Sequence, residues 1–231
     1  MKTIGLLGGM SWESTQTYYR LINEGVKSRL GGLHSAKLVL YSVDFAEIEA
    51  LQHQGDWPAT ARILSGAALS LENAGADFLM IGTNTMHKVA PEIEEAINIP
   101  LLHIADATAK VLTQDNIQRV GLLGTRFTME QAFYRERLEA AGIEVVTPDA
   151  PQRAEVHRVI YEELFQGEIQ AASRETYLAV INSLAEQGAQ AVILGCTEIG
   201  LLIKQTDTPV PLYDTTAIHA AQAVNQALSG D

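Results

Sequence analysis

The sequence has 231 residues, a formal net charge of −12, 47% apolar residues and one cysteine. One cysteine excludes an internal disulfide, and no window approaches the roughly 18 consecutive apolar residues that a membrane span requires. The N-terminal residues lack the apolar stretch and cleavage site of a signal peptide, so we expect a cytoplasmic protein with no membrane partner. The acidic balance argues against a nucleic-acid partner, because phosphates would be repelled.

Short apolar runs alternate with segments of helical period along the chain. The first run, residues 3–7, precedes a predicted helix at 12–27, in which Tyr18, Ile22 and Val26 share one face. Further strands are predicted at 37–41, 78–81, 100–103, 119–123, 144–146, 191–194 and 210–212, and further helices at 56–73, 133–141, 155–165 and 173–187. Continuous apolar strands between helices are typical of an α/β protein whose parallel sheets are covered on both faces.

The chain also repeats itself. Residues 71–76 and the following Gly82-Thr83-Asn84 resemble residues 184–189 and Gly195-Cys196-Thr197, with Thr83 and Cys196 113 residues apart. Residues 4–9 resemble residues 120–125 at a spacing of 116. The repeats predict two pseudo-symmetric, Rossmann-like α/β halves, residues 1–100 completed by a C-terminal helix at 214–231, and residues 101–213. Ligands of open parallel sheets bind beyond the carboxyl ends of strands, so we expect the site in a cleft between the halves.

The turn Gly8-Gly9-Met10-Ser11 lies between the first strand and the first helix. Backbone N–H groups at such a helix start can bind an anion. The glycine motifs for dinucleotides and for nucleotide phosphates are absent, so a carboxylate is the better candidate ligand. The alternative is a tight turn that binds nothing.

Cys196 follows a predicted strand in a glycine-containing turn. A free cysteine is most often a small buried hydrophobe. At a strand end that begins a helix, however, N–H dipoles can lower the pKa of the thiol and make a thiolate available. The repeat gives Thr83 as the counterpart of Cys196.

Hydroxyl and amide side chains follow the other strands. Asn84, Thr85, Thr125, Thr128 and Thr197 suit recognition of a small carboxylate, or serve only as helix caps. Asp44, Glu47, His87 and Glu198 lie near these turns and could orient a thiol or an ammonium group, although each alone fits better as a capping or solvated residue. The six histidines show no metal-ligand spacing, and one cysteine cannot build a cysteine-rich zinc site, so we expect no metal.

Taken together, residues 4–11, Thr83-Asn84-Thr85, Gly124-Thr125 and Gly195-Cys196-Thr197-Glu198 resemble the aspartate/glutamate racemase family, whose members work without pyridoxal phosphate. The resemblance implies no cofactor, an amino-acid substrate and a homodimer. In that family one thiolate removes the α-proton and a second thiol protonates the opposite face; the cysteine that matches Cys196 serves the L enantiomer. Catalytic roles then fall to Cys196 and Thr83. The expected substrate-binding residues are Gly9, Met10, Gln52, Asn84, Thr85, Thr125, Thr128, Thr197 and Glu198.

Two departures from the family pattern affect the expected activity. Thr83 stands where the family has cysteine, and an alcohol is too weak an acid to serve as a resting base, so we expect a bias towards L substrates. Residues 42–49 and 160–165 contain no basic residue. The substrate could therefore be aspartate, glutamate or a related polar amino acid. Its side chain could be contacted by Gln52, His53, His87, Lys88 or Arg174.

Two other functions are compatible with the same residues. Relatives with a single second-half cysteine use it for decarboxylation or isomerisation of dicarboxylates. In a non-catalytic amino-acid-binding protein, Cys196 would be inert. Pyridoxal phosphate dependence is disfavoured, because no lysine lies in a recognisable Schiff-base setting.

Overall fold

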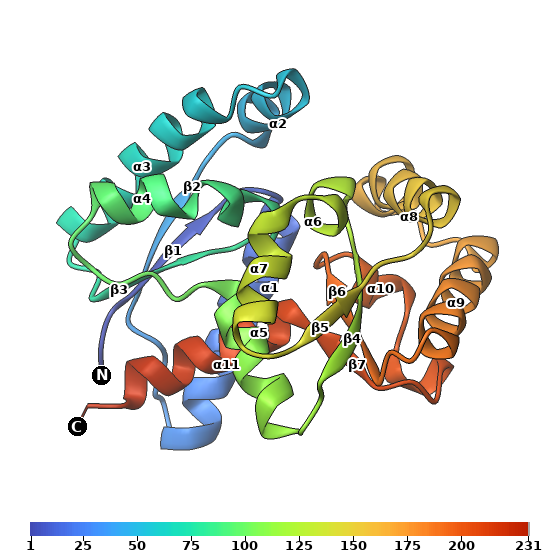
Figure 1. The fold of residues 1–231 in the computed structure, drawn as a ribbon. Coiled ribbons are helices and arrows are strands. Elements are labelled where there is room, and N and C mark those ends of the chain that lie inside the picture. Colours follow the sequence, from blue (N-terminus) through green and yellow to red (C-terminus); the bar gives the residue numbers. More distant parts are fainter. Residues whose placement is uncertain (231) are drawn as a thin grey trace. The chain divides into compact units, whose positions relative to one another are not determined.

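The computed structural model describes residues 1–230, which form two compact units (Figure 1). Unit 1 comprises Met1–Ile104 and the chain from His219 onward, and unit 2 comprises Ala105–Ile218. Residue 231, the last of the predicted C-terminal helix, lies outside the described residues. Each unit contains one parallel sheet flanked by helices, so the α/β prediction is confirmed. Within residues 1–230, no helix combines the length and apolarity needed to span a membrane.

The sheet of unit 1 has the strand order β2-β1-β3. Its strands are β1 (Ile4–Gly8), β2 (Leu38–Ser42) and β3 (Phe78–Ile81), and its helical segments are α1 (Trp12–Leu30), α2 (Phe45–Gln54), α3 (Trp57–Asn73), η1 (Thr85–Val89), α4 (Ala90–Ala96) and most of α11 (Thr215–Leu228). Gly8 pairs with Ser42, and Leu7 pairs with Ile81. The carboxyl ends of all three strands therefore lie at the same edge of the sheet.

Both faces of this sheet are covered, because side chains alternate along each strand. Ile4 and Leu6 pack with Val224 in an apolar cluster that joins the sheet to α1 and α11. Leu7 and Ile81 pack in a second cluster with α3 and α4. The continuous apolar runs of the sequence thus reflect burial on two sides.

The sheet of unit 2 has the order β5-β4-β6-β7. Its strands are β4 (Arg119–Gly124), β5 (Glu144–Val146), β6 (Ala191–Gly195) and β7 (Leu212–Asp214), and its helical segments are α5 (Ile104–Gln114), α6 (Arg126–Glu130), α7 (Ala132–Ala140), α8 (Ala150–Glu162), η2 (Leu164–Gln166), α9 (Ala171–Glu186), α10 (Ile199–Leu202) and η3 (Gln205–Asp207). Leu123, Val192 and Leu194 pack against α8, α9 and α10 in one cluster that also contains Cys196.

The predicted strand at 100–103 is wrong. Only an isolated bridge joins Leu101 to Leu79. The next backbone groups bind side chains instead of a strand: the carbonyl of Leu102 accepts from His219, and the N–H of Ile104 donates to His87. Helix α5 begins immediately afterwards. Both α2 and α5 lie in segments for which the sequence pattern predicts no element.

The two units share a topology. In each unit the first strand lies in the middle of three: β1 lies between β2 and β3, and β4 lies between β5 and β6. A further extended segment follows the third of these strands, namely the bridge at Leu101 in unit 1 and β7 in unit 2. The helix after each segment belongs mainly to the other unit, since α5 falls in unit 2 and α11 in unit 1.

Candidate functional site

The candidate residues form one group in each unit, at the carboxyl ends of adjacent parallel strands. We call Gly9, Thr83, Asn84 and Thr85 the first half-site; they follow β1 and β3, whose residues Leu7 and Ile81 are paired. The second half-site comprises Thr125, Cys196, Thr197 and Glu198, which follow the paired residues Gly124 and Gly195 of β4 and β6.

Gly9 makes the turn from β1 into α1 possible. Its φ is +94°, and a Cβ atom here would lie 2.6 Å from the backbone nitrogen of Val43 and in contact with its carbonyl oxygen. The Gly9 N–H donates to Thr15 Oγ1 at 2.8 Å, and Ser11 caps α1 by accepting from the N–H of Ser14. The predicted anion cradle is therefore wrong for the Gly9 N–H, because Thr15 already occupies it.

The Thr83 turn is held by a buried histidine. Thr83 is half-buried, whereas Asn84, Thr85 and His87 are buried. His87 Nδ1 lies 2.8 Å from the carbonyl oxygen of Thr83, and the N–H of Ile104 donates to His87 Nε2 at 3.2 Å. Because a carbonyl only accepts, Nδ1 carries the ring proton and His87 is neutral. His87 thus fixes the backbone of Thr83.

Further buried rings surround His87. The centroid of the His103 ring lies 4.4 Å from that of His87, and the His219 centroid lies 5.9 Å from it. His219 Nε2 donates to the Leu102 carbonyl at 2.8 Å, and Tyr18 OH lies 2.9 Å from His219 Nδ1. The sequence analysis missed this cluster, and no spacing signal reveals it, because Tyr18 and His219 are 201 positions apart.

The other candidate residues of unit 1 have structural partners. Met10 is buried in the apolar cluster beneath α3, and Gln52 is buried on α2. Lys88 Nζ lies 4.1 Å from the centroid of the Trp57 ring, a cation–π contact. His53 Nδ1 lies 2.8 Å from a carboxylate oxygen of Glu49, one turn earlier.

The second half-site lies where the carboxyl ends of β4 and β6 come close together. A Cβ atom on Gly195 would lie 2.7 Å from the carbonyl oxygen of Leu123, so only glycine allows β4 and β6 to approach here. Thr125 caps α6, accepting from the N–H of Thr128 at 3.4 Å. Thr128 is fully buried, and its hydroxyl lies 3.4 Å from that of Thr125. Thr128 therefore holds the Thr125 hydroxyl in place through its own N–H and hydroxyl groups.

Cys196 is 8% exposed and donates its S–H to Glu198 Oε2, with 3.0 Å between sulfur and oxygen. Burial, followed by the charge and the hydrogen bond of Glu198, raises the pKa of the thiol well above its usual range. The backbone N–H groups of Glu198 and Ile199 act in the opposite direction but do not outweigh burial. The prediction of a lowered thiol pKa is therefore wrong, because it considered the dipoles alone.

Glu198 is the buried acid of this half-site. It is 7% exposed, and Thr197 Oγ1 donates to the same Oε2 atom at 2.6 Å. Arg174, another candidate, donates its Nε to the carbonyl of Leu202 at 2.9 Å and thereby supports the end of α10.

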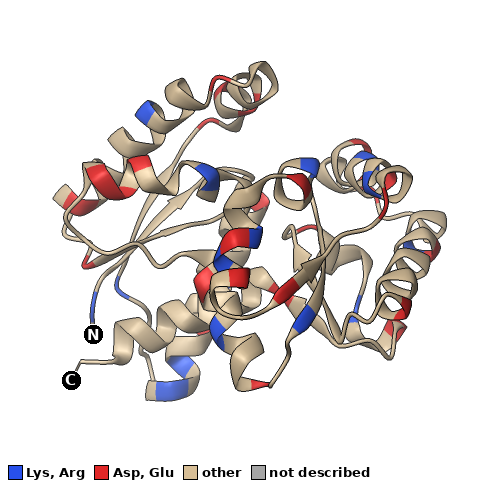
Figure 2. Ribbon diagram, viewed as in Figure 1, with Lys and Arg blue, Asp and Glu red and all other residues tan. Residues whose placement is uncertain are grey.

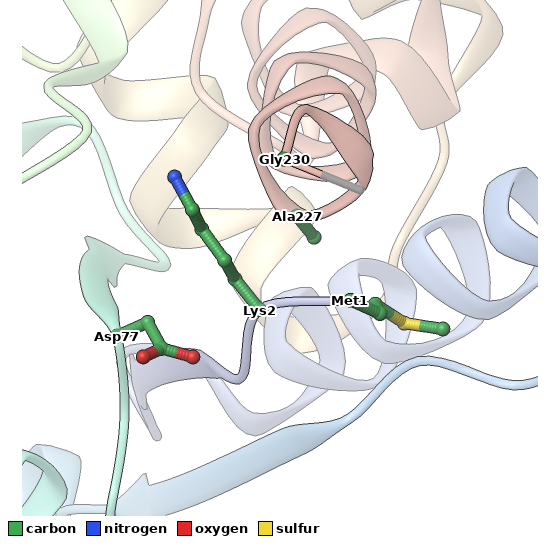
Figure 3. Close-up of a pocket in the computed structure, with 5 residues that line it drawn as sticks. All are labelled: Met1, Lys2, Asp77, Ala227 and Gly230. Carbon is green, nitrogen blue, oxygen red and sulfur yellow. The ribbon is translucent and has the colours of Figure 1, made fainter.

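A cavity of about 210 Å³ lies at the opposite edge of the unit 1 sheet. It is lined by Met1, Lys2, Asp77, Ala227 and Gly230 (Figure 3). Lys2 and Asp77 precede β1 and β3, whereas the first half-site follows these strands. The cavity is therefore distinct from the candidate site.

The net charge of −12 gives the protein little general attraction for an anion. Figure 2 shows acidic residues gathered on α4, where Glu92, Glu94 and Glu95 are exposed. Recognition of a carboxylate would depend on local N–H and hydroxyl donors. In residues 1–230, no group of three or more histidine, cysteine or acidic side chains is arranged to hold a metal ion.

The Asp/Glu/Hydantoin racemase family model matches residues 7–223, which include both half-sites. The chain belongs to this family. A Yersinia pestis protein described as a candidate Asp/Glu racemase is 60% identical, with 99% of this chain and 100% of that chain covered and a TM-score of 0.94. An aspartate racemase homologue from Pyrococcus horikoshii OT3 is 35% identical, with coverages of 98% and 99% and a TM-score of 0.86. A broad specificity amino-acid racemase from Bacillus subtilis is 25% identical over 98% of both chains. This family membership makes the protein an isomerase of the amino-acid racemase type.

Proposed function

We propose that the protein racemises aspartate, glutamate or a related polar amino acid by removing the Cα proton, with a bias towards L substrates. Cys196 is the base for the L enantiomer, and Thr83 acts on the opposite face. One observation carries the bias: the only thiol follows β6, and a hydroxyl occupies the corresponding position after β3.

The hydrogen-bond donors for the substrate carboxylate come from both half-sites. We assign the side chains of Asn84, Thr85 and Thr125 and the backbone N–H of Thr197, whose hydroxyl already donates to Glu198. Loss of the Cα proton delocalises charge onto the carboxylate, and aimed donors stabilise that charge. The other predicted contacts, Gly9, Met10, Gln52 and Thr128, receive supporting roles, and Glu198 lies beside the Cys196 thiol. Thr128 holds Thr125, and Gly9 allows β1 to turn beside Val43.

The substrate class rests on the relatives. The Pyrococcus protein is described as an aspartate racemase homologue, and the Bacillus protein as having broad specificity. In unit 1, Lys88 and His53 are engaged with Trp57 and Glu49. Because these two basic residues already have partners, we infer that the pocket accepts substrates with polar side chains in general and does not select strictly for a second carboxylate. Measuring turnover of L-aspartate, L-glutamate and the uncharged L-homoserine distinguishes broad from strict specificity.

Exchange of the α-proton in deuterium oxide tests the proposed reaction. We expect L-aspartate or L-glutamate to incorporate deuterium at Cα at least ~100-fold faster than the D enantiomer, because Cys196 is a far stronger base than Thr83. Nuclear magnetic resonance follows each enantiomer separately. Equal rates for the two enantiomers would contradict the bias.

The Thr83→Cys variant is the companion experiment. A thiol at position 83 should raise exchange of the D enantiomer at least ~10-fold while leaving exchange of the L enantiomer within the same order of magnitude. Thr60→Cys is a matched control, since Thr60 is also buried in unit 1 but lies on α3. An unchanged D rate in Thr83→Cys would remove Thr83 from the reaction.

The Cys196→Ser variant separates the proposal from its rivals. A racemase should lose exchange by at least ~10³-fold. A binding protein would keep its affinity for the amino acid and show no exchange even with Cys196 present. Release of carbon dioxide from a substituted malonate would instead indicate a decarboxylase.

We also propose a homodimer of this 25.1 kDa chain. Unit 1 exposes large apolar side chains that a second copy could cover, including Trp12, Tyr19 and Leu33. Light scattering of the purified protein measures the mass, and a monomer at micromolar concentration would contradict this proposal.

A further inference from the structure

The second half-site contains an acid–base pair within one short turn. Cys196 Sγ and Glu198 Oε2 are 3.0 Å apart, and both residues are less than one-tenth exposed. Thr197 Oγ1 donates to the same oxygen at 2.6 Å, which fixes the carboxylate towards the sulfur. The sequence offers Glu198 both as a substrate contact and as a residue that could orient a thiol, and in the structure its carboxylate is directed at the thiol.

We propose that Glu198 is a catalytic residue that accepts the proton of the Cys196 thiol and so generates the thiolate that removes the Cα proton. The inference rests on the proposed racemase function, which it deepens. It explains how a thiol without a cationic partner on this turn becomes a base. A carboxylate within hydrogen-bond distance can take the proton directly.

The resting state explains why an acceptor is needed. Burial and the adjacent carboxylate raise the pKa of Cys196, so the free protein holds a neutral thiol at neutral pH. A buried thiolate beside a buried carboxylate would place two negative charges together. Transfer of the proton to Glu198 leaves one negative charge in the pair at all times.

The proton balance is complete with water as the only co-reactant. The S–H bond breaks and an O–H bond forms on Glu198, which leaves a thiolate and a carboxylic acid. The thiolate then takes the Cα proton, and the C–H electron pair remains on the substrate. A solvent proton delivered at the Thr83 face gives the D product, while Glu198 returns its proton to water.

Other charged groups lie around this pair. Tyr177 of α9 interacts electrostatically with Cys196 and with Glu155, Arg158 and Glu163 at α8, and burial raises its pKa above the usual range. Arg158 bonds to Glu155 and Glu163, and Ser173 donates to Glu163 at 2.5 Å. These carboxylates therefore have partners of their own, and Glu198 is the one bonded to the thiol.

The Glu198→Gln variant tests the proposal with two measurements that should change in opposite directions. Because the chain has one cysteine, iodoacetamide alkylation followed by mass spectrometry reports Cys196 alone. Loss of the negative charge should move the alkylation midpoint down by about 1 pH unit or more. Exchange of L-aspartate or L-glutamate in deuterium oxide should fall at least ~100-fold, because the thiol loses its proton acceptor.

Two further variants act as controls. Glu155→Gln removes a nearby carboxylate that bonds to Arg158, so its alkylation midpoint should stay within about 0.3 pH unit and its exchange within about twofold of the original protein. Glu198→Asp keeps the charge but shortens the reach. It should retain a high alkylation midpoint and recover part of the exchange lost in Glu198→Gln.

The outcomes separate the two proposals. If the original protein exchanges no amino acid, the racemase function fails, whatever the alkylation result. If it exchanges L substrates but Glu198→Gln keeps either its alkylation midpoint or its exchange rate, Glu198 is not the proton acceptor. A parallel loss of alkylation and exchange in both Glu198 variants would indicate a structural role and would also overturn the inference.

Discussion

At the scale of single residues, burial decides the behaviour of the groups at the strand ends. The Cys196 thiol begins a short helical turn whose N–H groups favour the thiolate, yet desolvation and the Glu198 carboxylate outweigh them. A strand-end thiol is therefore not activated by position alone. Its reactivity depends on a partner that can take the proton.

Gly9 gives a prediction at the same scale. Gly9→Ala should lower the free energy of unfolding by about 3 kcal/mol or more, because a positive φ and a clash with the Val43 backbone add together. Gly55→Ala is the matched control: its φ is +73°, but no atom lies within 4 Å of the added Cβ. It should cost about 1 kcal/mol.

Thermal unfolding measures this difference, since each kcal/mol corresponds to roughly 2–4 °C in a chain of this size. Equal losses in the two variants would mean that the turn after β1 can relax and that the contact with Val43 imposes no constraint.

At the scale of elements, the histidine cluster links the Thr83 turn to the segments where the chain leaves and re-enters unit 1. His87 bonds to Thr83 and Ile104, and His219 bonds to Leu102. Unit 1 ends at Ile104 and resumes at His219. These buried side chains use backbone groups that a longer fourth strand would otherwise pair.

His219 predicts a pH dependence of stability. Burial lowers its pKa to about 4 from the usual value of 6.5. Between these values the unfolded chain binds the proton and the folded chain does not, so the free energy of unfolding falls as the pH falls through this window. The loss is about 3 kcal/mol and is complete below pH ~4.

The His219→Gln variant checks this contribution. Glutamine can accept from Tyr18 and donate to Leu102 without titrating, so urea unfolding at pH 7 and pH 4.5 should show a smaller pH dependence. His53→Gln removes an exposed histidine and should behave like the original protein. An undiminished pH dependence in His219→Gln would place the effect elsewhere.

At the scale of the whole molecule, the C-terminal helix stabilises the unit in which the chain begins. Ala223 and Val224 of α11 pack with Ile4, Leu6 and Phe78 in unit 1, although α11 follows the last strand of unit 2. Removing that cover would expose one face of the β2-β1-β3 sheet.

Ala223→Asp tests this arrangement. A carboxylate in this cluster should cost about 3 kcal/mol or more, and Ala221→Asp, on the exposed face of the same helix, about 0.5 kcal/mol or less. Hydrogen exchange should increase in peptides that cover β1 and β3 and remain nearly unchanged in β4 and β6. Greater exchange in β4 and β6 would contradict the assignment of α11 to unit 1.

The sequence by itself determined the fold class and most elements, because strand and helix periods and the glycine turns are local patterns. The predicted helix at 56–73 closely matches α3, which begins after the Asp56 cap. The repeat also aligned Thr83 with Cys196, since equivalent strand ends carry equivalent motifs. The predicted strand at 100–103 was wrong. Only Leu101 is bridged to β3, because the Leu102 carbonyl accepts from His219 and the N–H of Ile104, at the start of α5, donates to His87.

Only the tertiary structure decided the chemistry of the groups at those positions. The state of the Cys196 thiol depends on burial and on the direction of the Glu198 carboxylate, which spacing does not encode. The contact of His219 with the end of the first segment of unit 1 depends on packing between residues far apart in the chain, since His219 and Leu102 are 117 positions apart. Local sequence specifies which groups reach a strand end, and desolvation by the surrounding fold determines which of them can hold a charge.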